Sequence, residues 1–208
     1  SKTFTGIIFR ALVEEERIHP EESIAPFLEK DFPPKALVDL GKIRIADLVF
    51  HTSGLPQRAE NLKRKPFGGA VKEPYTKEQL MTDLEEAELQ FEPGQGWAYS
   101  NLGYALLGYI LEQHTGQTYE ELLQAYVIQP HGLGLTSTAL SPVERARLAR
   151  PYHPVFGTKT SDSSFGLHTA ASGIYSSTEE LAMLMQRQLA AYQNADSTTF
   201  EPLWITEE

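Results

Sequence analysis

Helical periodicity dominates this chain, whereas strand-like alternation of polar and apolar residues is scarce. In five segments the apolar residues recur three and four positions apart, the spacing that gathers them on one face of a helix. These segments begin near Thr3, Thr76, Leu102, Thr118 and Ser177. We therefore expect a mostly helical chain with few strands.

Capping residues mark the ends of several of these segments. Thr76 and Thr118 are each followed three positions later by Gln or Glu, the pattern of a capping box at a helix start. Gly116 occupies the position of a C-terminal glycine cap after the third segment. Pro130 is expected to end the fourth segment, because proline disrupts a helix interior.

Two long segments, residues 52–75 and 130–176, are rich in Gly, Pro, Ser and Thr and are expected to be loops. Long loops in a compact domain are more often functional than idle. The 208 residues fit one domain, and no shift in composition marks a boundary. We expect a single domain whose loops carry the function.

Composition excludes several classes of function. A formal net charge of −10, from 18 basic and 28 acidic residues, argues against nucleic acid or an anionic membrane as the main partner. The absence of cysteine excludes disulfides, thiol nucleophiles and Cys-ligated zinc, and the six histidines form no metal-binding pattern. No apolar run is long enough to cross a membrane, and no signal peptide is expected within this chain.

The stretch most suggestive of chemistry precedes the third helical segment. A turn at residues 93–94 places Tyr99, Ser100 and Asn101 just ahead of that helix. Such a loop can present a phenol and an amide to a cleft while the helix anchors them. The same residues also fit a purely structural interpretation, in which Tyr99 is packed, Asn101 caps the helix and Trp97 lies in the core.

Four motifs occur in a fixed order along nearly the whole chain. They are KTFT at 2–5, HTSGLP at 51–56, the stretch from PG at 93–94 to YSNLGY at 99–104, and AASGIYSSTEEL at 170–181. In this order the chain resembles the serine β-lactamase-related hydrolases, which include class C β-lactamases, D-alanyl-D-alanine carboxypeptidases and related esterases. The resemblance implies the α/β fold of serine β-lactamases and penicillin-binding proteins, with this chain holding mostly its helical part, long loops and few strands.

The family's first motif, Ser-x-x-Lys, lies at a helix start, where residues i and i+3 share a face and the amine lies beside the hydroxyl it activates. Lys2 matches the motif lysine, which places the nucleophilic serine two positions before Ser1. Ser1 is adjacent to Lys2 and does not fit. By this resemblance, residues 1–208 form a single incomplete domain, a fragment lacking both ends, which is expected to be inactive alone.

The resemblance also implies roles for the Tyr-x-Asn motif. Tyr99 and Lys2 would be catalytic and exchange protons, Asn101 would bind substrate, and Ser100 would face the helix cap. The implied reaction transfers an acyl group to serine and then to water, from a β-lactam, a D-alanyl peptide or an ester, without metal or organic cofactor. A periplasmic or extracellular location is implied. The alternative is a non-catalytic helical binding module on the same scaffold.

Other candidate residues carry weaker signals. The family's third motif, Lys/His-Thr/Ser-Gly, has a superficial match at Lys159, Thr160 and Ser161, but these residues precede the 170–173 loop and fit a solvated loop better. His51 is expected to shape its turn rather than to catalyse. His168 could line the cleft, although a structural role is the favoured interpretation.

In the resembling family, a sheet built from strands outside residues 1–208 covers one side of the first helix. We therefore expect the apolar stripe of this helix to be partly uncovered, and self-association or a partner chain to cover it. The stripe consists of Phe4, Ile7, Ile8 and Leu12.

Overall fold

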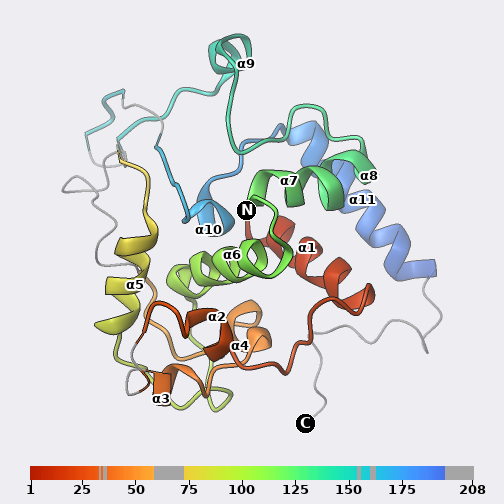
Figure 1. The fold of residues 1–208 in the computed structure, drawn as a ribbon. Helices are drawn as coiled ribbons and strands as arrows, with labels where there is room; N and C mark the ends of the chain where they lie inside the picture. The colour runs from red at the N-terminus through yellow and green to blue at the C-terminus, as the bar shows by residue number, and fades with distance from the viewer. Residues whose placement is uncertain (33, 35–36, 59–72, 154–155, 160–162, 195–208) are drawn as a thin grey trace.

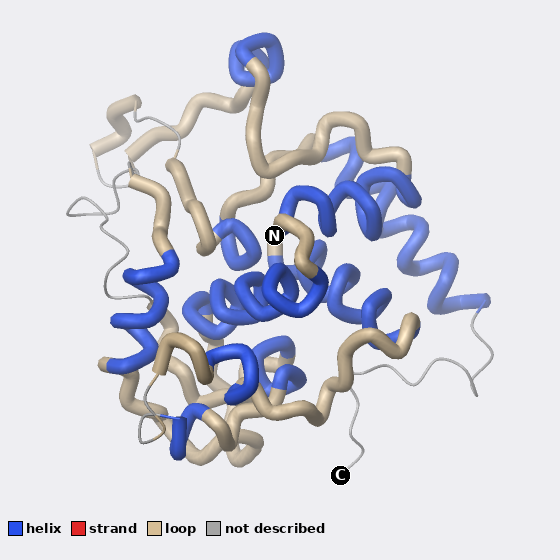
Figure 2. Tube along the Cα trace, viewed as in Figure 1, coloured by secondary structure: helices blue, strands red, loops and turns tan. Residues whose placement is uncertain are grey.

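The computed structural model describes the chain except residues 33, 35–36, 59–72, 154–155, 160–162 and 195–208. Its elements are α1 (Lys2–Glu14), α2 (Ala25–Leu28), α3 (Leu37–Leu40), α4 (Ile45–Val49), α5 (Lys77–Glu85), α6 (Asn101–Thr115), α7 (Tyr119–Leu123), the π-helix η1 (Gln124–Ile128), α8 (Gln129–His131), α9 (Pro142–Arg147), α10 (Thr169–Ser172) and α11 (Thr178–Asn194). Within the described residues, β pairing is limited to isolated bridges (Figure 2). The expectation of a helical chain with few strands is confirmed.

Helix α6 lies at the centre of the fold and contacts α1, α2, α4, α5, α7 and α10 (Figure 1). Every residue from Leu102 to Leu111 is buried. A helix that is apolar around its whole circumference is stable only when neighbours surround it. This central position lets residues at the start of α6 meet α1 and α10 in one place.

The predicted helix starts and the glycine cap are confirmed. Thr76 and Thr118 each form a capping box with the residue three positions later. Gly116 ends α6 with a φ of 70°, the left-handed conformation that glycine adopts without steric cost. The Ser177 hydroxyl accepts a hydrogen bond from the Glu180 amide at the start of α11.

The prediction that Pro130 ends its helix is wrong. Pro130 lies within α8, which follows η1 directly, and the helical run ends at Gly132 with a φ of 61°. The Gln129 amide donates to the Gln124 carbonyl and so closes a wide π turn just before the proline. Proline is tolerated in the first turn of a helical segment, where its missing N–H is not required.

The prediction of an uncovered stripe on α1 is wrong for three of its four residues. Phe4, Ile8 and Leu12 are buried because α6, α7, η1 and α10 pack against this helix. Ile7 is half-buried and lines a groove of about 290 Å³. The physical basis for expecting self-association through the stripe is therefore lost. Exposed apolar side chains occur instead on α11, namely Leu181, Met185 and Leu189.

The segment predicted as a loop over 130–176 is only partly irregular. It contains the end of α8 and the short helices α9 and α10, joined by extended stretches (Figure 2). Of the other predicted loop, residues 59–72 lie outside the described residues. No described helix is both long and apolar enough to span a membrane.

Close packing of α6 on α10 gives a first testable prediction. A Cβ at Gly108 would lie 2.6 Å from the Cβ of Ala170, whereas a Cβ at Gly6 of α1 meets nothing within 4 Å. Overpacking costs about 1–3 kcal/mol, more than the roughly 1 kcal/mol that Ala gains over Gly in a helix. We expect Gly108→Ala to lower the free energy of unfolding in urea titrations. Gly6→Ala is the control, and equal stability of the two variants would contradict the packing argument.

Candidate active site

The ammonium group of Lys2 joins three elements that are far apart in the sequence. Lys2 is the first residue of α1, and its Nζ donates to Asn101 Oδ1 at 2.6 Å and to the Ala171 carbonyl at 2.9 Å. Asn101 begins α6, and Ala171 lies in α10. Hydrogen bonds to a charged group are stronger than neutral ones, so these contacts fix the position of the amine.

Two tyrosine rings flank the same ammonium. Lys2 Nζ lies over the ring of Tyr99, 4.7 Å from its centroid, and 5.3 Å from the centroid of Tyr104. A cation over an aromatic face is attracted by the ring's quadrupole. The structure therefore brings Lys2, the Tyr99 ring and Asn101 together, and the catalytic and binding roles of these residues stay predictions.

The two tyrosines differ in their surroundings. Tyr104 is buried, and its hydroxyl donates to the Val49 carbonyl at 2.9 Å. Burial, with a smaller effect from Tyr99, raises the pKa of Tyr104 to about 12. Tyr99 is 40% exposed. Of this pair, Tyr99 is the one whose side chain is exposed to solvent.

The segment ahead of α6 is held by its middle residue. The Ser100 hydroxyl accepts from the Gly103 amide at 2.8 Å and donates to the Pro56 carbonyl at 2.8 Å. The backbone amide of Asn101 donates to the Gln57 carbonyl at 2.9 Å. Ser100 thus caps the helix, as expected, and leaves the side chain of Asn101 for Lys2.

The purely structural interpretation of this segment is wrong on each residue it invoked. Tyr99 is exposed rather than packed, Ser100 rather than Asn101 caps α6, and Trp97 is 66% exposed. Tyr99 thus keeps contact with both solvent and the Lys2 ammonium.

Helix α10 holds the start of α1 through backbone atoms. The Thr5 hydroxyl donates to the Ala170 carbonyl at 2.8 Å and accepts from the buried Tyr119 hydroxyl at 2.7 Å. The Ile174 amide donates to the Ser1 hydroxyl at 3.1 Å. Sequence reasoning missed the contact of Lys2 with the Ala171 carbonyl. The available signal was the run of small residues at 170–173, which lets α10 approach closely.

With this geometry established, comparison with known proteins identifies the family. The family model described as Beta-lactamase matches residues 1–204. The chain belongs to this family. The fold agrees, because a class C β-lactamase from Rhodobacter sphaeroides superimposes with a TM-score of 0.71 at 22% identity, covering 91% of this chain and 49% of that one.

Curated relatives of this β-lactamase-family chain carry the name D-alanyl-D-alanine carboxypeptidase. The protein from Escherichia coli K12 is 26% identical over 211 residues, which cover 89% of this chain and 48% of the relative. The protein from Salmonella typhimurium LT2 is 24% identical over 141 residues, which cover 67% of this chain and 32% of the relative. The chain spans about half the length of the first of these.

Of the two histidines considered from the sequence, one lies at the site and the other lies in the interior. His51 adjoins the site, and its ring centroid lies 4.7 Å from that of Tyr99. His168 is buried and packs against the rings of Tyr75 and Phe165, which is a structural position in the interior. Residues 160–161 of the Lys159 motif lie outside the described residues.

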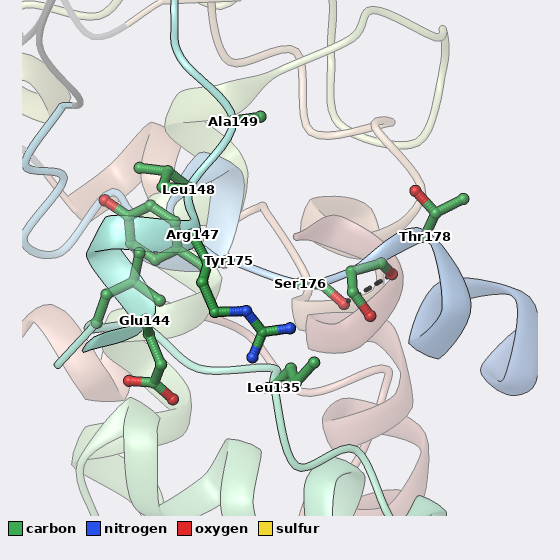
Figure 3. A pocket seen from close by; sticks show the side chains of 10 residues that line it. Leu135, Glu144, Arg147, Leu148, Ala149, Tyr175, Ser176 and Thr178 are labelled. Atoms are coloured by element: carbon green, nitrogen blue, oxygen red, sulfur yellow. Dashed lines mark hydrogen bonds between the residues drawn. The ribbon is translucent and has the colours of Figure 1, made fainter. Parts of the chain in front are cut away.

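A separate hollow of about 330 Å³ lies between α9 and the start of α11 (Figure 3). None of the three predicted site residues lines it. Its acidic group, Glu144, accepts from the Ser141 amide and hydroxyl at 2.8 and 2.6 Å and thereby caps α9. Glu144 therefore serves the helix start.

The turn that carries His51 is anchored by the buried carboxylate of Asp47. It accepts from the Arg44 amide, Nε and Nη2 at 2.9–3.0 Å and from the Thr52 hydroxyl at 2.8 Å. Burial opposes ionisation, but the bonds from Arg44 and Thr52 outweigh it and hold the pKa of Asp47 below its ordinary value. The ionised carboxylate thus stabilises the folded state.

We expect Asp47→Asn to lower the free energy of unfolding by about 1.5–3 kcal/mol at pH 7, because bonds to a charged acceptor are lost. Because the pKa of Asp47 is lower in the folded than in the unfolded chain, the ionised carboxylate stabilises the fold at pH values above the unfolded-state pKa. This stabilisation is lost as the pH falls through the folded-state pKa. The difference from wild type should therefore shrink below about pH 4 in urea titrations. Asp39→Asn, at an exposed ion pair with Lys42, should change little at either pH. A difference independent of pH would contradict the role of the charge.

Proposed function

We propose that the whole protein is a serine hydrolase of the β-lactamase and penicillin-binding-protein type, to which residues 1–208 supply Lys2, Tyr99 and Asn101. The observation that carries the proposal is the Lys2 ammonium, bonded to Asn101 Oδ1 at 2.6 Å and placed over the Tyr99 ring. A lysine, an accessible phenol and an amide on one site are the groups that acyl transfer to a serine requires.

Lys2 would activate the nucleophile. A serine three positions before Lys2 would lie on the same face of the helix, beside Nζ. Of the three N–H donors of an ammonium, Asn101 and Ala171 take two. The third N–H of the Lys2 ammonium can donate to the serine hydroxyl oxygen. Residues 1–208 do not contain this serine, so in this proposal they are inactive alone.

Tyr99 and Asn101 would act on the substrate. The serine oxygen attacks the acyl carbon while its proton passes to the deprotonated Tyr99 oxygen beside the Lys2 ammonium, and Tyr99 then gives that proton to the departing nitrogen or oxygen. Water then hydrolyses the acyl-enzyme and frees the serine. Because Oδ1 of Asn101 accepts from Lys2, its Nδ2 remains the donor for a carbonyl on the acyl side of the substrate.

The substrate is a D-alanyl peptide, a β-lactam or an ester. The names of the relatives support the first, and the structural neighbour, a class C β-lactamase, supports the second. A fold by itself does not select among such substrates.

The second candidate is a non-catalytic binding module that kept the scaffold. A purely structural cap-and-loop domain, unlike either candidate, predicts Tyr99 packed away from Lys2, contrary to the 4.7 Å between Nζ and the ring centroid. The gene for the whole protein discriminates between the two. A serine two positions before Ser1 and a Lys/His-Thr/Ser-Gly motif after residue 208 support the enzyme.

Tyr99→Phe tests the role of the phenol in the full-length protein. The ring and its contact with Lys2 are kept, but the proton-transfer group is lost, so turnover should fall about 10²–10⁴-fold. The measurement is hydrolysis of a chromogenic β-lactam and a D-alanyl-D-alanine peptide. Tyr152→Phe, which removes the hydroxyl of another exposed tyrosine, should leave turnover unchanged. Activity of Tyr99→Phe within a fewfold of wild type would mean that Tyr99 is structural.

The isolated polypeptide of residues 1–208 tests the position of the nucleophile. Incubated with a β-lactam or a fluorophosphonate probe, it should gain no covalent mass, whereas the full-length protein should gain one adduct. Intact-mass spectrometry measures both, and circular dichroism checks that the isolated polypeptide is helical. Stoichiometric acylation of residues 1–208 would overturn the assignment, because a serine within them would have to be the nucleophile.

A further inference from the structure

His51 contacts the backbone on both sides of Tyr99. Its Nδ1 accepts from the Ser100 amide at 3.1 Å, and its carbonyl accepts from the Ala98 amide at 2.9 Å. The residue has a φ of 63°, which is uncommon outside glycine. Backbone strain of this kind persists only where the surroundings enforce it, and it is concentrated at functional sites.

The hydrogen bond to Ser100 sets the protonation state of the ring. A backbone N–H can only donate, so Nδ1 must be the unprotonated nitrogen and the proton of the neutral ring must lie on Nε2. Protonation of Nδ1 would replace an acceptor by a donor facing another donor. The bond to Ser100 would then break.

The surroundings of the ring favour the neutral form. Its centroid lies 5.1 Å from that of Tyr104 and 6.0 Å from that of Trp97. Burial, and then the positive charge of Lys2, lower the pKa of His51. The titratable and charged groups of the neighbouring elements are Lys2 on α1, Asp47 on α4, Tyr99 ahead of α6 and Tyr104 on α6.

We propose that His51 is a positioning residue of the active site, whose neutral Nδ1 holds the segment of Tyr99, Ser100 and Asn101 against Lys2. This inference rests on the proposed function. His51 does not touch the reacting atoms in this scheme. It fixes the Ser100 peptide N–H, which directly follows the phenol, and so it helps to set the distance of Tyr99 from Lys2.

The anchors of the His51 turn and of the α6 N-cap do not themselves bond to the Tyr99 side of the segment, whereas His51 does. Asp47 fixes Thr52, the residue that follows His51, through the Thr52 hydroxyl. Ser100 fixes the start of α6 and is bonded to Pro56. Between these anchors, the His51 Nδ1 bond and the His51 carbonyl bond join the turn to the segment that carries Tyr99. Loss of the Nδ1 bond would loosen the segment on the Tyr99 side of Ser100, while Ser100 and Asn101 keep their bonds to Pro56 and Gln57.

Two substitutions in the full-length protein separate the acceptor from the ring. His51→Phe keeps an aromatic ring but has no acceptor, and we expect kcat to fall about 10–100-fold, as for a misplaced catalytic group, with a smaller change in KM. His51→Asn offers an amide oxygen near the position of Nδ1 and tolerates positive φ, so it should restore most of the activity. His19→Asn, at an exposed histidine, is the matched control and should behave as wild type.

The pH dependence of kcat/KM and the tautomer of the His51 ring distinguish the positioning role from a role in stability alone. In wild type, kcat/KM should fall on the acid side, at a pH below the ordinary histidine pKa of about 6.5, as Nδ1 is protonated, and His51→Asn should lack this limb. Long-range proton–nitrogen NMR at pH 7.5 should find the proton on Nε2 of His51. Hydrogen exchange of the Ser100 amide should be faster in His51→Phe than in wild type or His51→Asn.

The outcomes distinguish this inference from the proposed function. If wild type is acylated by a β-lactam but His51→Phe is acylated at the same rate, the positioning role is overturned and the proposed function stands. A proton on Nδ1, or an unchanged acid limb in His51→Asn, would likewise overturn it. If wild type is never acylated, the proposed function fails, while the tautomer and the Ser100 exchange rates still decide whether His51 holds this segment.

Discussion

The site depends on one partly buried ammonium group. Removing a charge from water is costly unless polar partners replace the water, and Lys2 finds an amide oxygen, a backbone carbonyl and two aromatic faces. Those partners come from residues 97 to 169 positions away in the chain. Satisfying Lys2 therefore requires α1, α6 and α10 to lie in a single arrangement, and the same arrangement brings the candidate catalytic groups together.

That arrangement is supported by contacts which have no direct part in chemistry. The absence of a side chain at Gly108 lets α10 approach α6 closely enough for the Ala171 carbonyl to reach the lysine. Asp47 holds the turn that carries His51, and Ser100 caps the start of α6. Each contact removes a freedom that the reacting groups would otherwise have, which is how a scaffold pre-organises a site.

How much was predictable depends on how local the determinant is. Helix caps such as that of Thr118 were predicted because two residues three positions apart, Thr118 and Glu121, decide them. The burial of Ile8 was missed because it depends on which helices pack against α1. The end of the fourth segment was misjudged because Pro130 lies in the first turn of α8, directly after a π turn, where its missing N–H is not required. Lys2, Tyr99 and Asn101 were predicted as a group from motif order. The Ala171 carbonyl was not, since a backbone acceptor leaves no signature in the side-chain sequence.

Two phenols lie against the same lysine, and their environments separate their roles. Tyr104 is buried with its hydroxyl donating to Val49, and its raised pKa of about 12 keeps it protonated at neutral pH. It packs against the ammonium, and its one hydroxyl proton is donated to the Val49 carbonyl. Tyr99 presents a similar ring to the ammonium while 40% of its surface remains exposed. In the proposed reaction, proton transfer therefore falls to Tyr99, and Tyr104 is the apolar wall that keeps the lysine in place.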